Sequence, residues 1–453
     1  MKILRFAAVG VAAALALTAC SSGDDNKPAD SAKPSASASA SESAAAPEAA
    51  TIKLWLNGTD TPDALREYLK TTFEAQNPGS KLVIEQQDWN GLVPRLQTAL
   101  SSEDQTPDLV EVGNTQSATF TYAGAFSDLT DLYPELGGDK LLPGFVEAGT
   151  ADGKVMAVPY YSGARAVFYN KDMFTAAGVE VPTTLADFTK VAQKLQTDKV
   201  SGFWFPGQDW YNGATWIYTN GGNLAVQDGD QWKGALSSPE SITGLKQVQE
   251  LFKTATHAPA DSDSNEPWVP FNQGKAAMFS APTWARWSID LPKCNEGVAA
   301  DDKSAKAQAK RVKQQACNEE HTGVFPMPGL DSSKVATAFA GGSNLGIPAK
   351  SKHQELAKNL LRIIFSADFQ NQLGKNGLIP GNTEYATSMG DDVYAKAAIA
   401  AALGAKLTPA AENWATVEGD RILEDFFQKL ATGADVTKSA ADADKLISDT
   451  LNK

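Results

Sequence analysis

Large apolar residues become frequent from residue 52 onward, and there strand-like and helix-like segments alternate along the chain. Apolar side chains alternate with other residues along 52–56, which is the period of a β-strand, and they recur at helical spacing along 65–73. Residues 81–89 and 108–113 form two further strand-like segments. Strands joined through helices predict a parallel sheet with helices on its faces, because a parallel connection needs a crossover. The sequence therefore predicts an α/β fold.

Polar and aromatic residues stand at the ends of these three expected strands. Asn57 ends the first, Trp89 ends the second, and Asn114 and Gln116 follow the third. In open parallel sheets, ligands bind beyond the carboxyl ends of the strands. We therefore expect these four residues to contact a ligand.

Length and composition limit the class of protein further. The N-terminal 50 residues differ from the rest, and the remaining residues of the 453 exceed what one core usually covers, so two lobes are expected. The net charge of −14 argues against nucleic acid as a partner, because phosphate contacts need clustered Lys and Arg. Only three His and three Cys occur, and they are scattered, so we expect no metal and no cofactor.

The N-terminus is typical of an export signal. Lys2 and Arg5 precede an unbroken small and apolar run over 6–17, which is too short to span a bilayer. The run ends in Leu-Thr-Ala-Cys, which resembles a bacterial lipobox, and this implies a signal peptide over 1–19 and lipid attachment at Cys20. The alternative is ordinary signal cleavage, with Cys20 as an incidental thiol.

Residues 20–50 predict a disordered tether. They consist almost entirely of Ser, Ala, Pro, Asp and Lys, without a large apolar side chain, so they cannot bury enough surface to offset their ordering entropy. No later stretch is apolar enough to span a bilayer. We therefore expect a body held by lipid on Cys20 at the extracellular face of the cell membrane.

Several segments of the body, in their order along the chain, carry a family resemblance. They are PDLVEVGNTQ (107–116), GAFSDLTDL (124–132), DGKVMAVPYYSGARAVFYNKDMF (152–174), FNQGKAAMFSAPTWA (271–285), GVFPMPG (323–329), GGSNLGIPAKSKHQELAKNLLRIIF (341–365) and NGLIPGNTEY (376–385). This set resembles the extracellular solute-binding proteins of sugar ABC importers, the group that includes maltose-binding protein. The resemblance covers residues 51–453.

The resemblance implies a two-lobed, periplasmic-binding-protein-like fold of type II, with a ligand cleft between lobes joined by hinge crossovers. It implies a first lobe of residues 51–163 and 324–379, and a second lobe of 164–323 and 380–453. The crossovers are expected near 160–165, 323–327 and 378–381. The implied partners are a carbohydrate ligand and ABC permease subunits in the membrane, and the protein is expected to be a monomer.

Aromatic residues beside polar ones suit the recognition of a sugar. A sugar ring packs its C–H face on an aromatic plane, and each of its hydroxyls needs a donor or an acceptor once water is excluded. The chain has ten Trp, most of them flanked by polar or charged residues. For any one of these Trp residues the alternative is a place in the core, because Trp buries a large area. The candidates for stacking are Trp210, Trp268, Trp284, Trp414 and, at a strand end, Trp89.

Two further polar residues are candidates for contacts with hydroxyls. Arg165 follows the first expected crossover, and the alternative is an ion pair that holds the hinge. Asn344 follows Gly341 and Gly342, which permit a close approach of the backbone to a ligand, and the alternative is a plain turn.

Cys294 and Cys317 are the two cysteines that remain after lipidation. In an exported protein they are expected to form a disulfide, which would close the polar, basic insertion between them. A redox pair is the alternative, but the C-x-x-C spacing is missing.

Two classes of function remain open at this point. The first is a binding protein that captures an extracellular sugar, an oligosaccharide in our interpretation, and delivers it to a permease without catalysing a reaction. The second is a secreted, lipid-anchored glycoside hydrolase, which would need two carboxylates facing one bond. The same fold with a peptide or a polyol as cargo is a further alternative.

Overall fold

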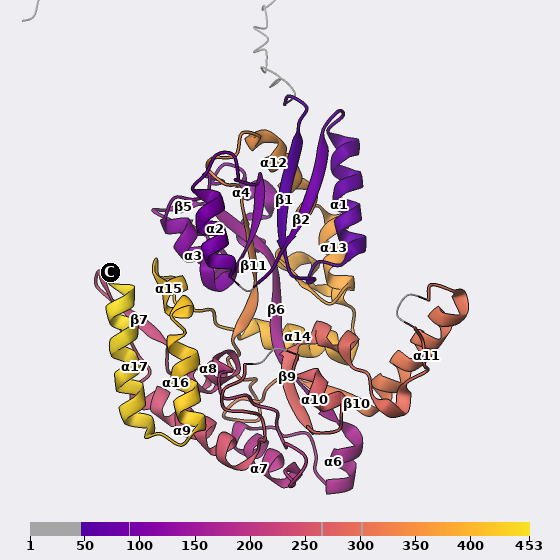
Figure 1. Cartoon of the computed structure of the whole chain (residues 1–453), viewed down its shortest axis with the longest axis vertical. Coiled ribbons are helices and arrows are strands. Elements are labelled where there is room, and N and C mark those ends of the chain that lie inside the picture. The colour runs from indigo at the N-terminus through magenta and orange to yellow at the C-terminus, as the bar shows by residue number, and fades with distance from the viewer. Residues whose placement is uncertain (1–46, 90, 264–265, 300–301) are drawn as a thin grey trace, which may run out of the picture. The chain divides into compact units, whose positions relative to one another are not determined.

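The computed structural model describes residues 47–453, apart from residue 90, residues 264–265 and residues 300–301 (Figure 1). The expected signal peptide, Cys20 and the tether as far as residue 46 lie outside the described residues. Residues 47–453 form one compact unit.

An eight-stranded mixed sheet runs through this unit. Its strands are β1 (Thr51–Asn57), β2 (Lys81–Gln87), β3 (Leu109–Gly113), β6 (Ala157–Asn170), β9 (Met278–Pro282), β10 (Thr322–Phe325), β11 (Ala340–Gly346) and β12 (Ile379–Pro380). The order is β10-β6-β11-β3-β1-β2, and β9 and β12 also pair with β6. The predicted parallel pairing of the first three strands is confirmed, since β1 runs parallel to both β2 and β3. The other pairs are antiparallel.

Two small hairpins and a set of helices make up the rest of the regular secondary structure among the described residues. The hairpins pair β4 (Thr150–Ala151) with β5 (Lys154–Val155), and β7 (Ala225–Asp228) with β8 (Gln231–Gly234). The α-helices are α1 (Asp63–Gln76), α2 (Leu92–Leu100), α3 (Asn114–Tyr122), α4 (Tyr133–Leu136), α5 (Pro143–Ala148), α6 (Lys171–Ala177), α7 (Leu185–Leu195), α8 (Trp210–Thr219), α9 (Pro239–Thr254), α10 (Trp268–Asn272), α11 (Ala305–His321), α12 (Gln354–Ile364), α13 (Ala367–Lys375), α14 (Val393–Leu403), α15 (Trp414–Gly419), α16 (Ile422–Ala431) and α17 (Val436–Leu451). Short 3-10 helices are η1 (Gly138–Lys140), η2 (Thr283–Ser288), η3 (Pro292–Cys294) and η4 (Thr383–Met389).

The strand β6 changes partners along its length. Its first half, as far as Ala164, pairs with β11, and its second half, from Arg165, pairs with β9 and then also with β10. Figure 1 shows β6 extending from the group of β1, β2 and β11 to β9 and β10. One continuous strand therefore belongs to both groups of strands. The exact boundaries of the two lobes stay a prediction.

Each group of strands has its own apolar core. The first core packs one face of β1 and β3 against α1, α12 and α13, and the second core packs α7, α8, α9, α16 and α17 together. The alternation along 52–56 explains the first core, because Ile52, Leu54 and Leu56 point into it while Trp55 points to a further cluster on the opposite face of the sheet. Phe120 of α3 packs in that further cluster.

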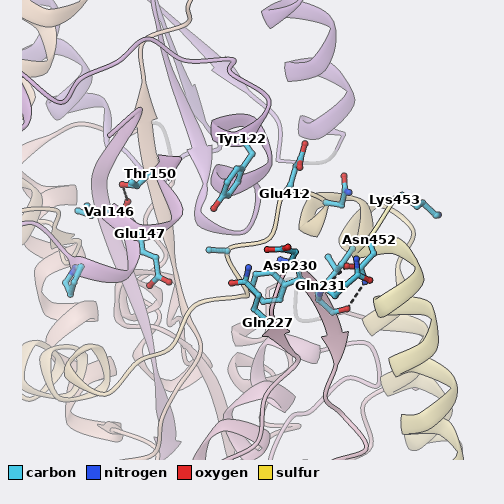
Figure 2. Close-up of a pocket in the computed structure, with 15 residues that line it drawn as sticks. Tyr122, Val146, Glu147, Thr150, Gln227, Asp230, Gln231, Glu412, Asn452 and Lys453 are labelled. Atoms are coloured by element: carbon cyan, nitrogen blue, oxygen red, sulfur yellow. Dashed lines mark hydrogen bonds between the residues drawn. The ribbon is translucent and has the colours of Figure 1, made fainter. Parts of the chain in front are cut away.

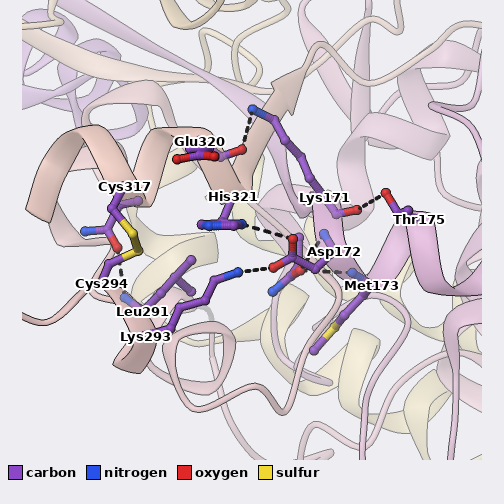
Figure 3. Close-up of polar contacts among 12 residues, drawn as sticks. Lys171, Asp172, Met173, Thr175, Leu291, Lys293, Cys294, Cys317, Glu320 and His321 are labelled. Atoms are coloured by element: carbon purple, nitrogen blue, oxygen red, sulfur yellow. Dashed lines mark hydrogen bonds and ion pairs between the residues drawn. A yellow bond between two sulfur atoms is a disulfide. The ribbon is translucent and has the colours of Figure 1, made fainter.

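The described residues of the basic insertion form an arm that we define as residues 295–299 and 302–321, of which α11 is the main part. In Figure 1, α11 extends away from the strands and from the other helices. Cys294 and Cys317 are joined by a disulfide with an S–S distance of 2.04 Å (Figure 3). The Nζ of Lys171 donates hydrogen bonds to the carbonyl oxygens of Glu319 and Glu320, where a cation stabilises the end of a helix.

An ionic contact also holds the base of the arm. The carboxylate of Asp172 pairs with Lys293, and its Oδ1 lies 3.0 Å from the Nδ1 of His321. Lys293 first, and then His321, lower the pKa of Asp172. Figure 3 shows both contacts beside the disulfide. The disulfide joins the arm to η3, and His321 and the Lys171 hydrogen bonds join it to α6.

We expect the arm to loosen when the disulfide is removed by Cys294→Ser with Cys317→Ser. The disulfide closes a loop between residues that are 23 positions apart. A loop of this length corresponds to about 3 kcal/mol, or about a 100-fold change in the opening equilibrium. Trypsin cleavage within 303–313, followed by mass spectrometry, should become up to about 100-fold faster. Cleavage at Lys438 and Lys445 of α17 serves as the control, and equal rates within the arm would contradict the expectation.

Candidate functional site

A buried carboxylate lies beneath the carboxyl ends of β1 and β3. Glu111 is fully buried, and its carboxylate accepts hydrogen bonds from the backbone N–H of Asn57 at 2.7 Å and from the Oγ of Ser343 at 2.5 Å. Burial raises the pKa of Glu111 to about 7, and the two hydrogen bonds oppose this rise. The side chain of Asn57 donates to the backbone oxygen of Glu111 at 3.0 Å. This contact fixes the end of β1 to β3.

A second carboxylate follows β1 and lies nearer to the surface. The Oδ2 of Asp60 accepts hydrogen bonds from the Tyr161 hydroxyl at 3.0 Å and from the Trp89 indole N–H at 3.1 Å. Burial raises the pKa of Asp60. Trp89 is 37% exposed, so part of its ring is free to contact a ligand.

The helices α3 and α15 pack against each other along a polar contact that we call the α3–α15 seam. The Thr115 hydroxyl donates to the Oε2 of Glu418 at 2.8 Å, and the side-chain amide of Gln116 donates to the same oxygen at 3.0 Å. One turn further along α3, the Thr119 hydroxyl accepts from the backbone N–H of Ala415 at 3.2 Å. Because Trp414 and Val417 of α15 belong to the second core, the seam joins the two lobes.

Buried polar atoms that are short of hydrogen-bond partners collect at this seam. They are the Oε1 of Gln116, the Oε1 of Glu418, the Nε1 of Trp414 and, on α8 and α16, the Nε1 of Trp210 and the Oε2 of Glu424, and all are fully buried. The Trp414 indole faces Glu418 and the Trp210 indole faces Glu424, and each lowers the pKa of its carboxyl as a hydrogen-bond donor does. Burying such an atom unpaired costs about 1–3 kcal/mol. These atoms include both donors and acceptors, so the seam is suited to a ligand that offers hydroxyl or amide groups.

The carboxylate of Glu418 is a strongly perturbed group of the seam. Burial raises its pKa to about 7, the hydrogen bonds from Thr115 and Gln116 oppose this rise, and the charge of Glu424 adds to it. Burial also raises the pKa of Glu424. Burial first, and then the charges of the same two carboxylates, raise the pKa of Tyr211. The Arg165 guanidinium lies over the Tyr211 ring, 5.6 Å from its centroid. Arg165 therefore lies beside the seam.

Gly113 connects the seam to Trp89. A Cβ at this position would lie 2.3 Å from the Oε1 of Gln116 and 3.2 Å from the Trp89 ring, so a larger residue would displace both side chains. Of the residues predicted from the sequence, the structure thus brings together Trp89, Gln116, Trp210, Arg165 and Trp414. The alternative for Arg165 requires an ion pair, and among the described residues none is found; its guanidinium lies over the Tyr211 ring.

The remaining predicted residues lie elsewhere. The Asn114 amide donates to the backbone oxygen of Ala340, and the Asn344 amide donates to the Ser117 hydroxyl and the backbone oxygen of Phe145, all within the first lobe. Trp268 and Trp284 form an edge-to-face pair with centroids 5.6 Å apart. Whether these residues contact a ligand stays a prediction.

The structure changes the interpretation of three of these residues. The alternative of a plain turn around Asn344 is wrong, because residues 340–346 form β11 and pair with β3 and β6. Trp210 and Trp414 are only 1% and 0% exposed, so neither offers a ring face in this arrangement. Both rings belong to the second core, and only their N–H groups reach the seam.

Sequence reasoning missed the carboxylates of the site and one phenol. These are Asp60, Glu111, Tyr161, Glu418 and Glu424. Two of them carried a local signal, since Asp60 stands three residues after a strand end and Glu418 stands one helical turn after Trp414. Within the described residues, no group of three or more His, Cys, Asp or Glu is arranged to hold a metal ion. In the same part of the chain, no helix has the length and apolar character to cross a membrane.

The sequence and the fold match known proteins over most of the chain. Residues 57–371 match the family described as bacterial extracellular solute-binding protein. The diacetylchitobiose binding protein DasA of Streptomyces coelicolor is 30% identical over 465 aligned positions, which cover 100% of this chain and 99% of that protein.

Two solved structures are similar in fold. The GacH receptor of Streptomyces glaucescens has a TM-score of 0.72 at 20% identity, covering 90% of this chain and 99% of the receptor. Maltose-bound MalE3 of T. maritima has a TM-score of 0.70 at 20% identity, covering 88% and 99%. At this identity the likeness concerns the fold alone, and it confirms the predicted two-lobed α/β architecture of type II.

The raised pKa of Glu418 predicts how stability depends on pH. The folded protein holds a proton on Glu418 up to about pH 7, whereas the carboxyl of the unfolded chain releases it near its ordinary pKa of 4.5. The stabilisation is therefore complete below about pH 4.5 and is lost as the pH rises through 7. The difference between the two pKa values corresponds to up to about 3 kcal/mol.

We expect Glu418→Gln to be as stable as the wild type at pH 5 and more stable at pH 7.5, in the absence of ligand. Thermal melts at the two pH values measure this. Glu355→Gln, at an exposed carboxylate that pairs with Lys358, is the control and should follow the wild type. The same pH dependence in Glu418→Gln and in the wild type would contradict the assignment.

Proposed function

The chain belongs to the bacterial extracellular solute-binding proteins, and we propose that it captures an oligosaccharide outside the cytoplasmic membrane and delivers it to the permease of an ABC importer. The observation that carries this proposal is the set of buried polar atoms that are short of hydrogen-bond partners at the α3–α15 seam, among them the Oε1 of Gln116. A sugar supplies hydroxyl hydrogens to carboxylate oxygens and hydroxyl oxygens to indole N–H groups, so it can satisfy such atoms.

The chemistry of the seam suits an N-acetylated sugar in particular. An acetamido group carries a carbonyl, which accepts from an indole N–H, and an N–H, which donates to a carboxylate such as Glu418. A relative that matches the chain over its whole length is named as a diacetylchitobiose binding protein. Diacetylchitobiose is therefore the first ligand to test, and a peptide or a polyol is the alternative cargo.

The mechanism follows from the two sides of the seam. Gln116 belongs to α3 of the first lobe, and Glu418 belongs to α15 of the second. A ligand that forms hydrogen bonds to both helices binds most tightly when the helices face each other. It therefore stabilises this closed arrangement of the lobes over an open one. We take residues 51–163 with 324–379, and 164–323 with 380–453, as the two moving lobes.

We further propose that the protein binds its sugar without breaking a bond. The family consists of substrate-binding proteins. The hydrolase alternative makes a distinct prediction, because it would release shorter products during prolonged incubation with an oligosaccharide. Unchanged oligosaccharide in product analysis supports the binding protein.

We expect Trp89→Ala to weaken the binding of diacetylchitobiose by at least about 10-fold, because the partly exposed ring beside Gln116 is suited to stack on a sugar. Calorimetric titration of the purified protein measures this. Trp287→Ala is the matched control. Trp287 is 55% exposed, and the one ring contact found for it among the described residues is with the Arg286 guanidinium. Equal affinities of the two variants would argue against Trp89, and no binding of any saccharide at millimolar concentration would refute the function.

We propose that lipid on Cys20 anchors the protein at the extracellular face of the membrane, with residues 20–50 as the tether. Cys20→Ala should then release the protein into the medium, because acylation needs the thiol. Immunoblots of the medium and of the membrane fraction measure this, and sugar binding should be unchanged. Retention of Cys20→Ala in the membrane fraction would show a different anchor.

A further inference from the structure

A groove lies at the outer end of the α3–α15 seam. Its volume is about 730 Å³, and an adjoining cavity of about 420 Å³ shares Glu147, Gln227, Trp232 and Ala410 with it. None of the side chains of the buried seam lines the groove, which makes it a separate space (Figure 2). This volume lies within the usual range of small-molecule sites, about 300–1,000 Å³.

Both lobes contribute to the walls of this groove. Tyr122 ends α3, and Glu147 belongs to α5, so these two side chains come from the side of the first lobe. The β7–β8 hairpin, residues 410–413 and the C-terminal end of α17 form the opposite side. Figure 2 shows the Tyr122 ring pointing toward the hairpin that carries Gln227 and Asp230.

The groove presents polar side chains that have no partner in the protein. Among the described residues, nothing bonds to the side chains of Glu147, Gln227, Asp230, Gln231 or Glu412. Donors and acceptors therefore face the groove from both walls, and their number and mixture suit a molecule that carries many hydroxyls.

Two aromatic side chains accompany these polar groups. Tyr122 is 47% exposed, and Trp232 lines both the groove and the adjoining cavity. The side chain of Asn452 holds the backbone of Trp232 on both sides, accepting from its N–H at 2.9 Å and donating to its carbonyl oxygen at 2.7 Å. The position of Trp232 is therefore well fixed, as a platform for a sugar ring requires.

We propose that this groove is a second saccharide-binding site, in which a sugar ring packs on Trp232 or Tyr122 and its hydroxyls bond to the amides and carboxylates of the two walls. This inference rests on the proposed function, because it assumes that the protein meets saccharides. It goes beyond that function because it assigns a site outside the buried seam.

Occupation of the groove is coupled to the seam. Glu412 comes two residues before Trp414, and Tyr122 ends the helix whose first turn bonds to Glu418. A saccharide that contacts both walls stabilises the packing of α3 on α15, so each site raises the affinity of the other.

The test is a calorimetric titration of the full chain with diacetylchitobiose and with tetraacetylchitotetraose. The wild type should show two binding events with at least one of these saccharides. Trp232→Ala and Tyr122→Ala should each weaken the second event by at least about 10-fold. The first event should weaken less than the second, because these two side chains act on it only through the coupling. Trp287→Ala, at an exposed Trp remote from the groove, is the matched control and should leave both events unchanged.

Each outcome decides between the two proposals. Because Trp232 also packs on the second core, Gln231→Ala, a polar change on the exposed face of β8, provides a variant that keeps the fold. A single event that none of the three groove variants alters would overturn the second site while the proposed function stands. A second event that persists in all three would also overturn it, and binding of no saccharide at all would refute both proposals.

Discussion

The continuity of β6 is the constraint on which the rest of the structure depends. Its backbone pairs with β11 as far as Ala164 and with β9 from Arg165, so one strand completes two groups of strands. Because every backbone N–H and C=O in a buried strand needs a partner, neither group can be displaced at this point without loss of hydrogen bonds. The strand β9, which η2 follows directly, pairs with β6 itself, whereas β3, which α3 follows directly, is joined to β6 through β11.

The α3–α15 seam contains groups that a core built only for stability would exclude. The carboxylate of Glu418 is retained among indole rings, where burial holds its pKa near 7, and the Oε1 of Gln116 has no donor. The free energy of unfolding is lower as a result, since unpaired buried polar atoms oppose folding. Recognition of a polar solute explains such a cost, because the same atoms can form hydrogen bonds across the seam once a ligand supplies the partners.

Local sequence patterns predicted most strands and helices of the first lobe. They did not show which aromatic residues of either lobe are buried and which are exposed. The alternation along 52–56 predicted β1, because the period of a strand depends only on local geometry. Trp210 and Trp414 have polar neighbours in the sequence, yet helices that are distant in the chain cover both rings. Asp60 stands just after a strand end, but its partners Tyr161 and Trp89 lie on other elements, so the local sequence did not show these contacts.

The sequence by itself determined the α/β class, the parallel pairing of the first three strands, the resemblance to a family of binding proteins and the acidic charge of the body. Only the tertiary structure decided which Trp residues are buried, that Glu418 meets Thr115 and Gln116, and that a groove opens beside Tyr122. The physical reason is the range of the interactions. Hydrophobic period and backbone propensity act over a few residues, whereas burial and hydrogen-bond partners at the seam depend on segments about three hundred positions apart.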